Sequence, residues 1–388
     1  SNSMTVRITK PEFNLREKIS ELDRPTGLKG SELIKSDTLQ DARNSINAGR
    51  KNLIINGNPL IYQRAKSVSP AVTYAYNTAD RWRISANKSQ VGRVSEMSVE
   101  TNADIGGDFI GNYVRINHTT AASSPHAEAS YGYNYRIEPE DIIPYLGKEM
   151  VLSFYARSNV GIAINSGFFS GTTSSSIKFA DPADSTTFLH LTSNWKRYEY
   201  YFTVGTTIPT SFVDVGLRHQ VDKVGYVDMS GIQLELGGRA TEFEHRSFNE
   251  ELALCQRYFQ SNFPITHVSG MTSFVAPQNG YYNANSGLAA GFNGAVCFSS
   301  NNLRSPHIMF HPQMREQPDV TLYSTSNNDD DGKWAAYDHT GGWSSSSANQ
   351  IDYFGNRGFG VRYAAGGISA DIGEAYLYRG SWEADAEL

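Results

Sequence analysis

The stretch YVDMSGIQLELGGRATEFEHRSFNEELALCQRYF, residues 226–259, decides how the chain is divided. Over residues 226–236, apolar side chains alternate with polar or small ones, which is typical of a half-buried strand, and the alternation slips near Gly231. Gly237 and Gly238 end the predicted strand. We therefore predict that one β domain ends here and that a second β region begins just after residue 259.

The second half of the stretch predicts an extended segment and then a helix. Residues 239–248 are charged and aromatic without a helical period, so we expect them to run extended across the edge of the first domain. Asn249 has the side chain of an N-cap, and Glu250 and Glu251 follow in the first turn, where free N–H groups favour carboxylates. One face of this helix carries Leu252, Cys255 and Phe259.

This stretch resembles a signature found in many bacteriophage tail-fibre and receptor-binding proteins, in which it closes a carbohydrate-binding-module-like jelly roll. The matching elements are residues 233–235, 241–246, 250–252 and 255–258. Residues 52–65 are similar to the opening strand and turn of such modules, although Pro59 and Tyr62 depart from the pattern, and Asp80, Arg81 and Trp82 match a strand start. The resemblance implies a phage tail protein with a jelly-roll domain.

Composition is consistent with a β-rich protein. A chain of 388 residues is too long for a single domain core of ordinary size. Its 22 tyrosines, 19 phenylalanines and 34 glycines favour an aromatic, turn-rich β fold. A net charge of -6 argues against nucleic acid as a partner, and the sequence has no apolar run long enough for membrane insertion. Cys255 and Cys297 are too few for a disulfide framework, so we expect buried thiols.

The predicted fold class is all-β, with two β-sandwich, jelly-roll-like domains behind a short α-helical N-terminal segment. Residues 1–50 form that segment, 51–238 the first sandwich, 239–262 a linker and helix, and 263–388 a C-terminal sandwich that acts as a receptor-binding head. The two short helices expected in residues 4–50 have apolar stripes that need a cover. Other copies of the chain, another protein or the neighbouring β domain are the alternatives, and the resemblance of this segment to the attachment segment of short-tailed phage fibres favours virion anchoring.

Catalytic and metal-binding motifs are not evident. The sequence has no nucleophile elbow, Walker motif or zinc-protease motif, so we predict that the protein is not an enzyme and needs no cofactor. The resemblance to calcium-containing jelly rolls makes Asn56 and Asp228 possible calcium ligands, but the prediction is that no metal is bound. His307 and His311 lie four residues apart in the sequence. They are expected either to contact the same residues of other copies on an oligomer axis or to be ordinary polar residues.

Glycan binding needs exposed aromatic faces flanked by polar groups. Tyr131, Tyr133 and Tyr135 share a strand face, but Ile137 continues that face, which favours a core. The polar stretch of residues 326–350 instead predicts a long exposed loop. The predicted glycan-binding residues in and near it are Trp334, Tyr337, Trp343, Asp338, His339 and Asn349, with Tyr281 and Tyr282 in a second turn.

These observations predict a non-enzymatic phage tail fibre or receptor-binding protein that attaches to a host cell-surface polysaccharide through its C-terminal loops. We expect a homotrimer in the virion tail, made in the host cytoplasm without a signal peptide and bound to phage tail proteins through residues 4–50. Multivalency would then raise the avidity of weak single sites. The alternatives are a structural tail or adaptor component without glycan binding, and a tail-associated glycan depolymerase.

Overall fold

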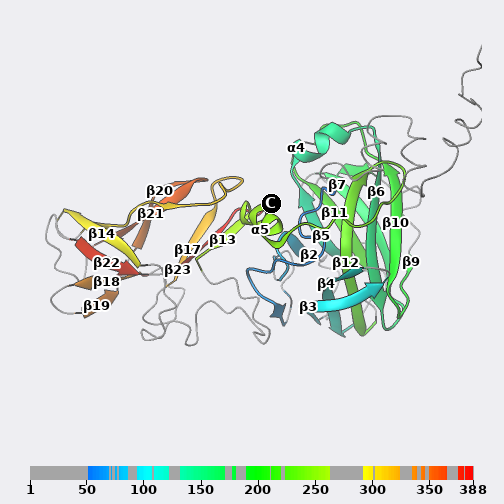
Figure 1. Cartoon of the computed structure of the whole chain (residues 1–388), viewed down its shortest axis with the longest axis horizontal. Coiled ribbons are helices and arrows are strands. Elements are labelled where there is room, and N and C mark those ends of the chain that lie inside the picture. Colours follow the sequence, from blue (N-terminus) through cyan, green and yellow to red (C-terminus); the bar gives the residue numbers. More distant parts are fainter. Residues whose placement is uncertain are drawn as a thin grey trace, which may run out of the picture. The chain divides into compact units, whose positions relative to one another are not determined.

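A computed structural model shows an all-β chain, as the sequence predicts (Figure 1). It describes residues 51–387 except 70, 72–74, 77, 86–93, 107–108, 122–131, 171–176, 181–188, 210, 220–222, 263–291, 300–301, 324–333, 339–341, 346–348, 365–374 and 380. The predicted helices of residues 4–50 lie outside the described residues. Among the residues that are described, no helix has the length and apolar character needed to cross a membrane.

The first sandwich consists of two antiparallel sheets, which we name sheet A and sheet B. In order, sheet A contains β1 (Ser67–Val68), β3 (Val94–Gly106), β4 (Phe109–Thr120), β12 (Gly225–Leu236), β6 (Glu149–Ser158) and β10 (Lys196–Thr203). Sheet B contains β2 (Trp82–Ser85), β5 (Gly132–Ile137), β11 (Val213–His219), β7 (Ala163–Ser170) and β8 (Ile177–Ala180), with β9 (Leu189–His190) also paired to β7.

Alternation along these strands produces the core. On β10, Tyr198, Tyr200 and Phe202 are buried, whereas the residues between them are exposed. Within sheet B, Trp82 of β2 stacks on Tyr133 of the neighbouring β5, with ring centroids 4.4 Å apart. Tyr133 and the neighbouring Tyr135 are buried, which confirms the prediction that this face of the strand lies in the core; Tyr131 lies outside the described residues.

β12 lies between β4 and β6 and carries the predicted slip in alternation. Its pairing register with β6 shifts between Ser230 and Gln233, and Gly231 adopts φ 58°. A Cβ atom on Gly231 would lie 2.9 Å from Tyr155 Cδ2 and 3.0 Å from Phe109 Cε1, so the position lacks both the space and the backbone freedom for a side chain. The bulge is therefore specific to glycine.

The chain leaves sheet A through an extended strap, residues 239–247, as the sequence predicts. The strap is fixed to the strand it follows, because the Thr241 amide donates to Glu235 (2.8 Å) and the Glu244 amide donates to Gln233 (2.8 Å). Arg246 donates from Nη1 to the Ile54 carbonyl oxygen (3.0 Å). The segment predicted as a linker is thus hydrogen-bonded to the first sandwich along much of its length.

Helix α5 (Phe248–Gln256) follows the strap, but the predicted N-cap is wrong. Ser247, not Asn249, is the cap, because Ser247 keeps an extended backbone (φ -64°, ψ 153°) and its hydroxyl accepts the Glu250 amide. Asn249 is already inside the helix, while Glu250 and Glu251 lie in the first turn as expected. The other helices among the described residues are α4 (Pro139–Ile142) and the 3-10 helix η2 (Ile143–Tyr145).

The C-terminal region forms two further antiparallel sheets, sheet C and sheet D. Sheet C contains β13 (Phe259–Ser261), β23 (Ser381–Asp385) and β17 (Asp319–Tyr323). Sheet D contains β16 (Ile308–Met309), β21 (Gly358–Ala364), β15 (Asn302–Arg304), β14 (Phe292–Ser299), β22 (Ala375–Arg379), β18 (Ala335–Asp338) and β19 (Gly342–Ser345), with β20 (Asn349–Gly355) paired to β21. The apolar core of this region includes Phe310, Trp334, Phe359 and Trp382.

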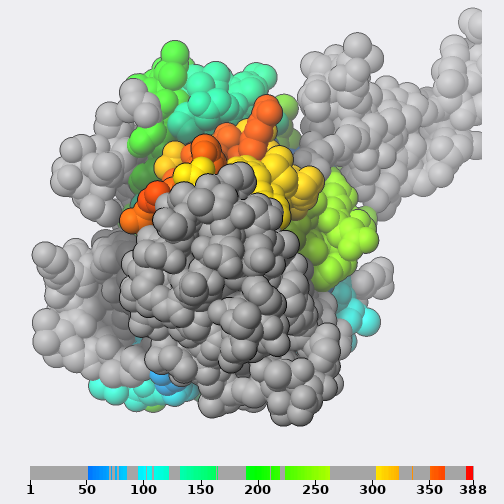
Figure 2. Space-filling model, turned by 90° about the vertical axis from the view of Figure 1, so that its left-hand side faces the viewer, coloured from blue at the N-terminus to red at the C-terminus, as the bar shows by residue number. Residues whose placement is uncertain are grey.

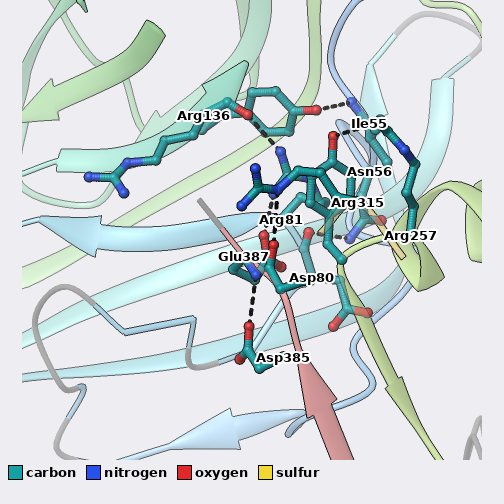
Figure 3. Close-up of polar contacts among 12 residues, drawn as sticks. Ile55, Asn56, Asp80, Arg81, Arg136, Arg257, Arg315, Asp385 and Glu387 are labelled. Carbon is teal, nitrogen blue, oxygen red and sulfur yellow. Dashed lines mark hydrogen bonds and ion pairs between the residues drawn. The ribbon is translucent and has the colours of Figure 1, made fainter. Parts of the chain in front are cut away.

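The last residues of the chain return to the first sandwich (Figure 3). Arg81 is fully buried, pairs with Glu387 and donates to the Arg136 carbonyl oxygen (2.6 Å). Its guanidinium carbon lies 3.4 Å from the ring centroid of Tyr258, just before β13. Arg64 pairs with Asp385 at 3.0 Å. Burial of these charges is offset by their mutual pairing, so the C-terminal strand is tied to the first sandwich by charge as well as by packing.

Candidate functional site

The outer face of sheet A presents charged and aromatic side chains instead of apolar ones. On β12, Val227 and Met229 belong to the core, so Tyr226 and Asp228 lie on the opposite face of the strand. Pairing places Asp228 directly between Arg115 of β4 and Arg157 of β6. Three adjacent strands therefore bring one carboxylate and two guanidinium groups to the same point.

The contacts of Asp228 fix both arginines. Arg115 donates to the carboxylate from Nε and Nη2 at 2.8 and 2.9 Å, and Arg157 donates from Nε at 2.8 Å. The Asp228 side chain is fully buried beneath the two arginines, which are 30% and 25% exposed. The hydrogen bond to Asp228 raises the pKa of Arg115, so this guanidinium stays charged. The result is a pair of preoriented, solvent-facing hydrogen-bond donors.

Aromatic rings flank the two arginines. Arg115 lies over the ring of Tyr226, 4.0 Å from its centroid, and Arg157 lies 4.7 Å from that of Trp195. Trp195 also meets Tyr113 edge to face, with centroids 5.3 Å apart. Tyr226 and Trp195 are both partly exposed, whereas Tyr113 is nearly buried. We call this set the arginine–tyrosine face: Tyr113, Arg115, Arg157, Trp195, Tyr226 and Asp228.

The strap borders this face with a small apolar cluster. Phe243 of the strap packs on Phe109 of β4, with ring centroids 5.3 Å apart. Phe109 in turn stacks on Tyr155 of β6, with centroids 5.4 Å apart. Tyr113 and Trp195 belong to the same cluster. The aromatic rings are consequently held by packing before any ligand arrives, which lowers the entropy lost on binding.

The chemistry of the arginine–tyrosine face suits an uncharged polar ligand with flat apolar faces. Arg157 binds Asp228 through Nε, and its side chain is 25% exposed, so part of its guanidinium group faces solvent. One carboxylate and two guanidinium groups give a net charge of only one. Hydroxyl groups can accept from the arginines while aliphatic C–H surfaces pack on the rings.

Trp334, one of the predicted glycan-binding residues, does not lie on the surface. Its side chain is fully buried, because it fills the core of the C-terminal region, so the expectation of an exposed ring is wrong for this residue. The predicted long loop is also partly wrong, since β18 and β19 form a hairpin within it. Tyr337 and Trp343 are opposite each other across this hairpin.

The remaining predicted glycan-binding residues stay predictions. Asp338 pairs with Gly342 at the end of the same hairpin, and Asn349 begins β20. His339, Tyr281 and Tyr282 lie outside the described residues. The structure thus places Tyr337, Trp343 and Asp338 on the adjacent strands β18 and β19.

Neither possible calcium ligand is arranged for a metal. Asn56 uses its side-chain oxygen to accept the amides of Leu60 (2.9 Å) and Ile61 (3.0 Å), while both oxygens of Asp228 accept from arginines. Within the described residues, no three His, Cys, Asp and Glu side chains are grouped closely enough to hold a metal ion. Both residues instead have structural hydrogen-bonding roles.

Sequence reasoning missed Arg115, Arg157 and the two rings beside them as a site. From the sequence, Asp228 was predicted only as a possible calcium ligand. The available signal was the strand alternation itself, because Arg115 and Asp228 are polar residues between core residues. The sequence did not show which strands are neighbours in the sheet, because β4, β6 and β12 are far apart along the chain.

Comparisons with known proteins match part of the chain by fold. No family model and no curated protein match the sequence. A solved structure described as "CBM4 structure and function" has a TM-score of 0.31 and 14% identity, covering 47% of this chain and 98% of the other. A putative sugar binding protein from Bacteroides thetaiotaomicron has a TM-score of 0.34 and 15% identity, covering 48% and 100%.

A third similar structure is the enzymatically active domain of tailspike protein 4 from bacteriophage CBA120. It has a TM-score of 0.32 and 13% identity, and the match covers 48% of this chain but 21% of the tailspike chain. Structures described as carbohydrate-binding modules and a phage tailspike domain are thus among the chains that resemble this one. At these TM-scores the likeness carries no functional argument, so the residues must supply it.

Proposed function

We propose that the protein binds a glycan on the arginine–tyrosine face of sheet A and serves as a non-enzymatic receptor-binding protein of a phage tail. The observation that carries the proposal is the bridging of Arg115 and Arg157 by Asp228. This triad holds two sets of N–H donors between partly exposed aromatic rings. Aromatic rings beside fixed planar donors are the groups that recognise sugars.

The charge of the face favours a neutral glycan over a strongly acidic one. Asp228 neutralises one of the two guanidinium groups, and Glu199 lies within 3.8 Å of Arg197 on the neighbouring β10. An acidic polysaccharide would gain little from so balanced a surface. The expected ligand is therefore a neutral polysaccharide whose hydroxyl groups accept hydrogen bonds.

A binding role fits this face better than hydrolysis. Glycoside hydrolysis uses two carboxyl groups, one as acid and one as base or nucleophile. The oxygens of Asp228 are occupied by arginine donors, so this carboxylate is a poor candidate for either task. Asp80, whose pKa burial raises to about 6, is fully buried at the junction with the C-terminal strand and is screened from any polymer.

The assignment to a phage tail rests on sequence resemblance. Residues 233–235, 241–246, 250–252 and 255–258 match the tail-fibre signature, and residues 4–50 resemble an attachment segment. In this proposal the N-terminal segment binds phage tail proteins, the chain forms a homotrimer, and the virion tail carries it to the host. Three equivalent faces would strengthen a weak single-site affinity.

The test is binding of the full-length protein to an array of neutral and acidic bacterial polysaccharides. Tyr226→Ala and Trp195→Ala should each weaken binding by about 1 kcal/mol or more through lost stacking. Tyr353→Ala is the matched control, because Tyr353 is an exposed tyrosine (72%) on β20, outside this face. If Tyr353→Ala and Tyr226→Ala weakened binding equally, or no polysaccharide bound, the proposal would be wrong.

Release of new reducing ends from a bound polysaccharide would instead show a depolymerase. Normal host adsorption by phage that carry both Tyr226→Ala and Trp195→Ala would favour a structural tail component. A mass measurement in solution tests the trimer separately, and a monomer at micromolar concentration would contradict it.

A further inference from the structure

The face of sheet D that points away from its core carries two arginines that share one carboxylate. Leu303 and Val361 lie in the core. Their neighbours Arg304 of β15 and Arg362 of β21 are therefore on the opposite face, where they are paired directly across the ladder. Asp352 of β20 has its Oδ2 atom 3.7 Å from Arg304 Nη2 and 3.5 Å from Arg362 Nε. Three side chains thus converge on one oxygen atom. Figure 2 shows β20 and β21 (orange) at the surface, beside the yellow residues that include β15 and β16.

The ion pairs of Asp352 are looser than those of Asp228 in sheet A. Asp228 accepts hydrogen bonds of 2.8 and 2.9 Å from its two arginines, whereas both distances to Asp352 exceed the length of a charge-assisted hydrogen bond. Among the described residues, Arg362 Nε is buried and has no hydrogen-bond partner. Two like charges directly opposite each other also destabilise a ladder. Asp352 therefore compensates the two guanidinium groups only in part, which favours an anion at this point.

A β-bulge turns Tyr353 to the same side of the sheet. The register between β20 and β21 shifts between Asp352 and Gly355, and Tyr353 adopts φ 50°, a left-handed conformation that is uncommon for any residue except glycine. Regular alternation would direct Tyr353 into the core, but it is 72% exposed, and Phe354 packs against the core in its place. Bulges re-aim side chains in this way.

Two contacts hold the exposed tyrosine in place. Arg304 Nη1 donates to the Tyr353 hydroxyl (2.6 Å), and the guanidinium carbon lies 5.4 Å from the ring centroid. His307 Nε2 donates to the Tyr353 carbonyl oxygen (3.0 Å), which can only accept. Strained backbone of this kind persists where the surroundings hold it, and it clusters at ligand-binding sites. The ring is therefore oriented beside the arginines before a ligand arrives.

We propose that Arg304, Asp352, Tyr353 and Arg362, which we name the Tyr353 site, bind a saccharide that carries a carboxylate, such as a uronic acid. The carboxylate accepts hydrogen bonds from the two arginine side chains, which are 34% and 30% exposed, so it approaches from solvent and needs no gap between them. A C–H face of the sugar packs on the exposed ring of Tyr353. Two guanidinium groups and one carboxylate leave a single positive charge, which matches a monoanion better than a phosphate dianion.

The experiment is a calorimetric titration of the full-length protein with a trisaccharide of galacturonic acid and with its methyl ester. The ester keeps the sugar rings and removes the charge, so the acid should bind clearly more tightly. Arg304→Gln and Arg362→Gln should each weaken binding of the acid roughly 10- to 100-fold, as loss of a hydrogen bond to a charged group does. Tyr353→Ala should weaken it about 2- to 10-fold through lost stacking.

Control variants separate the Tyr353 site from unspecific binding and from the arginine–tyrosine face. Arg239→Gln removes an exposed arginine of the strap, and Tyr226→Ala removes a partly exposed ring of sheet A. Neither change should weaken binding of the acid. Tyr353→Ala should in turn leave binding of a neutral polysaccharide unchanged, so either proposal can fail without the other.

Three results would overturn the proposal. The first is equal affinity for the acid and its methyl ester, which would show that charge is not recognised. The second is binding of the acid that Tyr353→Ala and Arg304→Gln leave unchanged, with circular dichroism confirming that both variants are folded. The third is tighter binding of galactose 6-phosphate than of galacturonic acid, which would assign the site to phosphate.

Discussion

Arg64 near the start of the first sandwich and Asp385 near the end of the chain form an ion pair of 3.0 Å between Nη2 and Oδ2. Arg81 makes the equivalent contact with Glu387, and its side chain is only 1% exposed. Asp385 at the end of β23 and Glu387 just beyond it thereby pair with two arginines of the first sandwich, of which Arg81 is fully buried and Arg64 is 13% exposed. The final residues of the chain thus contribute to the stability of a domain that ends some 150 positions earlier in the sequence.

Removing the Glu387 carboxylate should destabilise the protein strongly. Glu387→Ala leaves Arg81 buried without its charge partner, and breaking such a pair costs about 3–5 kcal/mol. Chemical denaturation measures the free energy of unfolding. Glu316→Ala is the control, because Glu316 is 53% exposed and its loss should change stability by less than about 0.5 kcal/mol. Equal effects of the two variants would contradict the role of the buried contact.

Asp80 should make stability depend on pH in the acid range. Burial raises its pKa from 3.8 to about 6, although Arg64 and Gln63 act in the opposite direction. The native state therefore holds this proton more tightly than the unfolded chain, so stability falls as pH rises from about 4 to about 6. The free energy of unfolding should therefore fall by a few kcal/mol, roughly, once the pH exceeds about 6.

Asp80→Asn isolates this contribution. Other buried carboxyl groups, such as Glu251, whose pKa is also raised by burial, remain in both proteins and cancel in the difference. The variant should gain stability relative to the wild type across this pH range and keep the gain at neutral pH. A difference that does not change with pH would show that Asp80 titrates normally.

Gly231 should resist substitution. Gly231→Ala adds a Cβ atom at φ 58°, within 3.0 Å of Tyr155 and Phe109, so we expect a loss of about 1–3 kcal/mol in the free energy of unfolding. Gly355→Ala provides the matched control, because nothing lies within 4 Å of its Cβ position. Thermal unfolding of the two variants should therefore differ clearly, and similar midpoints would argue against the bulge as described.

Cys255 should be unreactive in the folded protein. Its side chain is fully buried, and burial raises the pKa of the thiol well above its ordinary value, which suppresses the reactive thiolate. In a Cys297→Ser background, a thiol reagent should modify the chain only after denaturant is added. Rapid labelling under native conditions would contradict the burial of Cys255.

Much of the fold follows from local pattern. Strand alternation located β12 and its slip at Gly231, and the parity of Tyr133, Tyr135 and Ile137 identified a core face. The N-cap was misassigned by two residues, since Ser247 and Asn249 are both good caps and only the backbone of the strap decides between them. Local chemistry therefore predicted which elements form better than where they begin.

The candidate site could not be predicted in the same way. A cluster such as Arg115, Asp228 and Arg157 depends on which strands are neighbours, and that is settled by non-local pairing. Trp334 shows the opposite error, because a tryptophan in a polar stretch was expected to be exposed but completes a distant core. A polar sequence context does not establish exposure when the aromatic ring itself drives burial.

The most direct test of the central claim is hydrogen–deuterium exchange of the full-length protein with and without a polysaccharide that binds it on the array. Our account predicts slower exchange in β4, β6 and β12 and around Trp195, where the arginine–tyrosine face lies. If the polysaccharide slowed exchange only in β18 and β19 and left sheet A unchanged, the account would be contradicted. The binding site would then lie on the C-terminal hairpin that carries Tyr337 and Trp343.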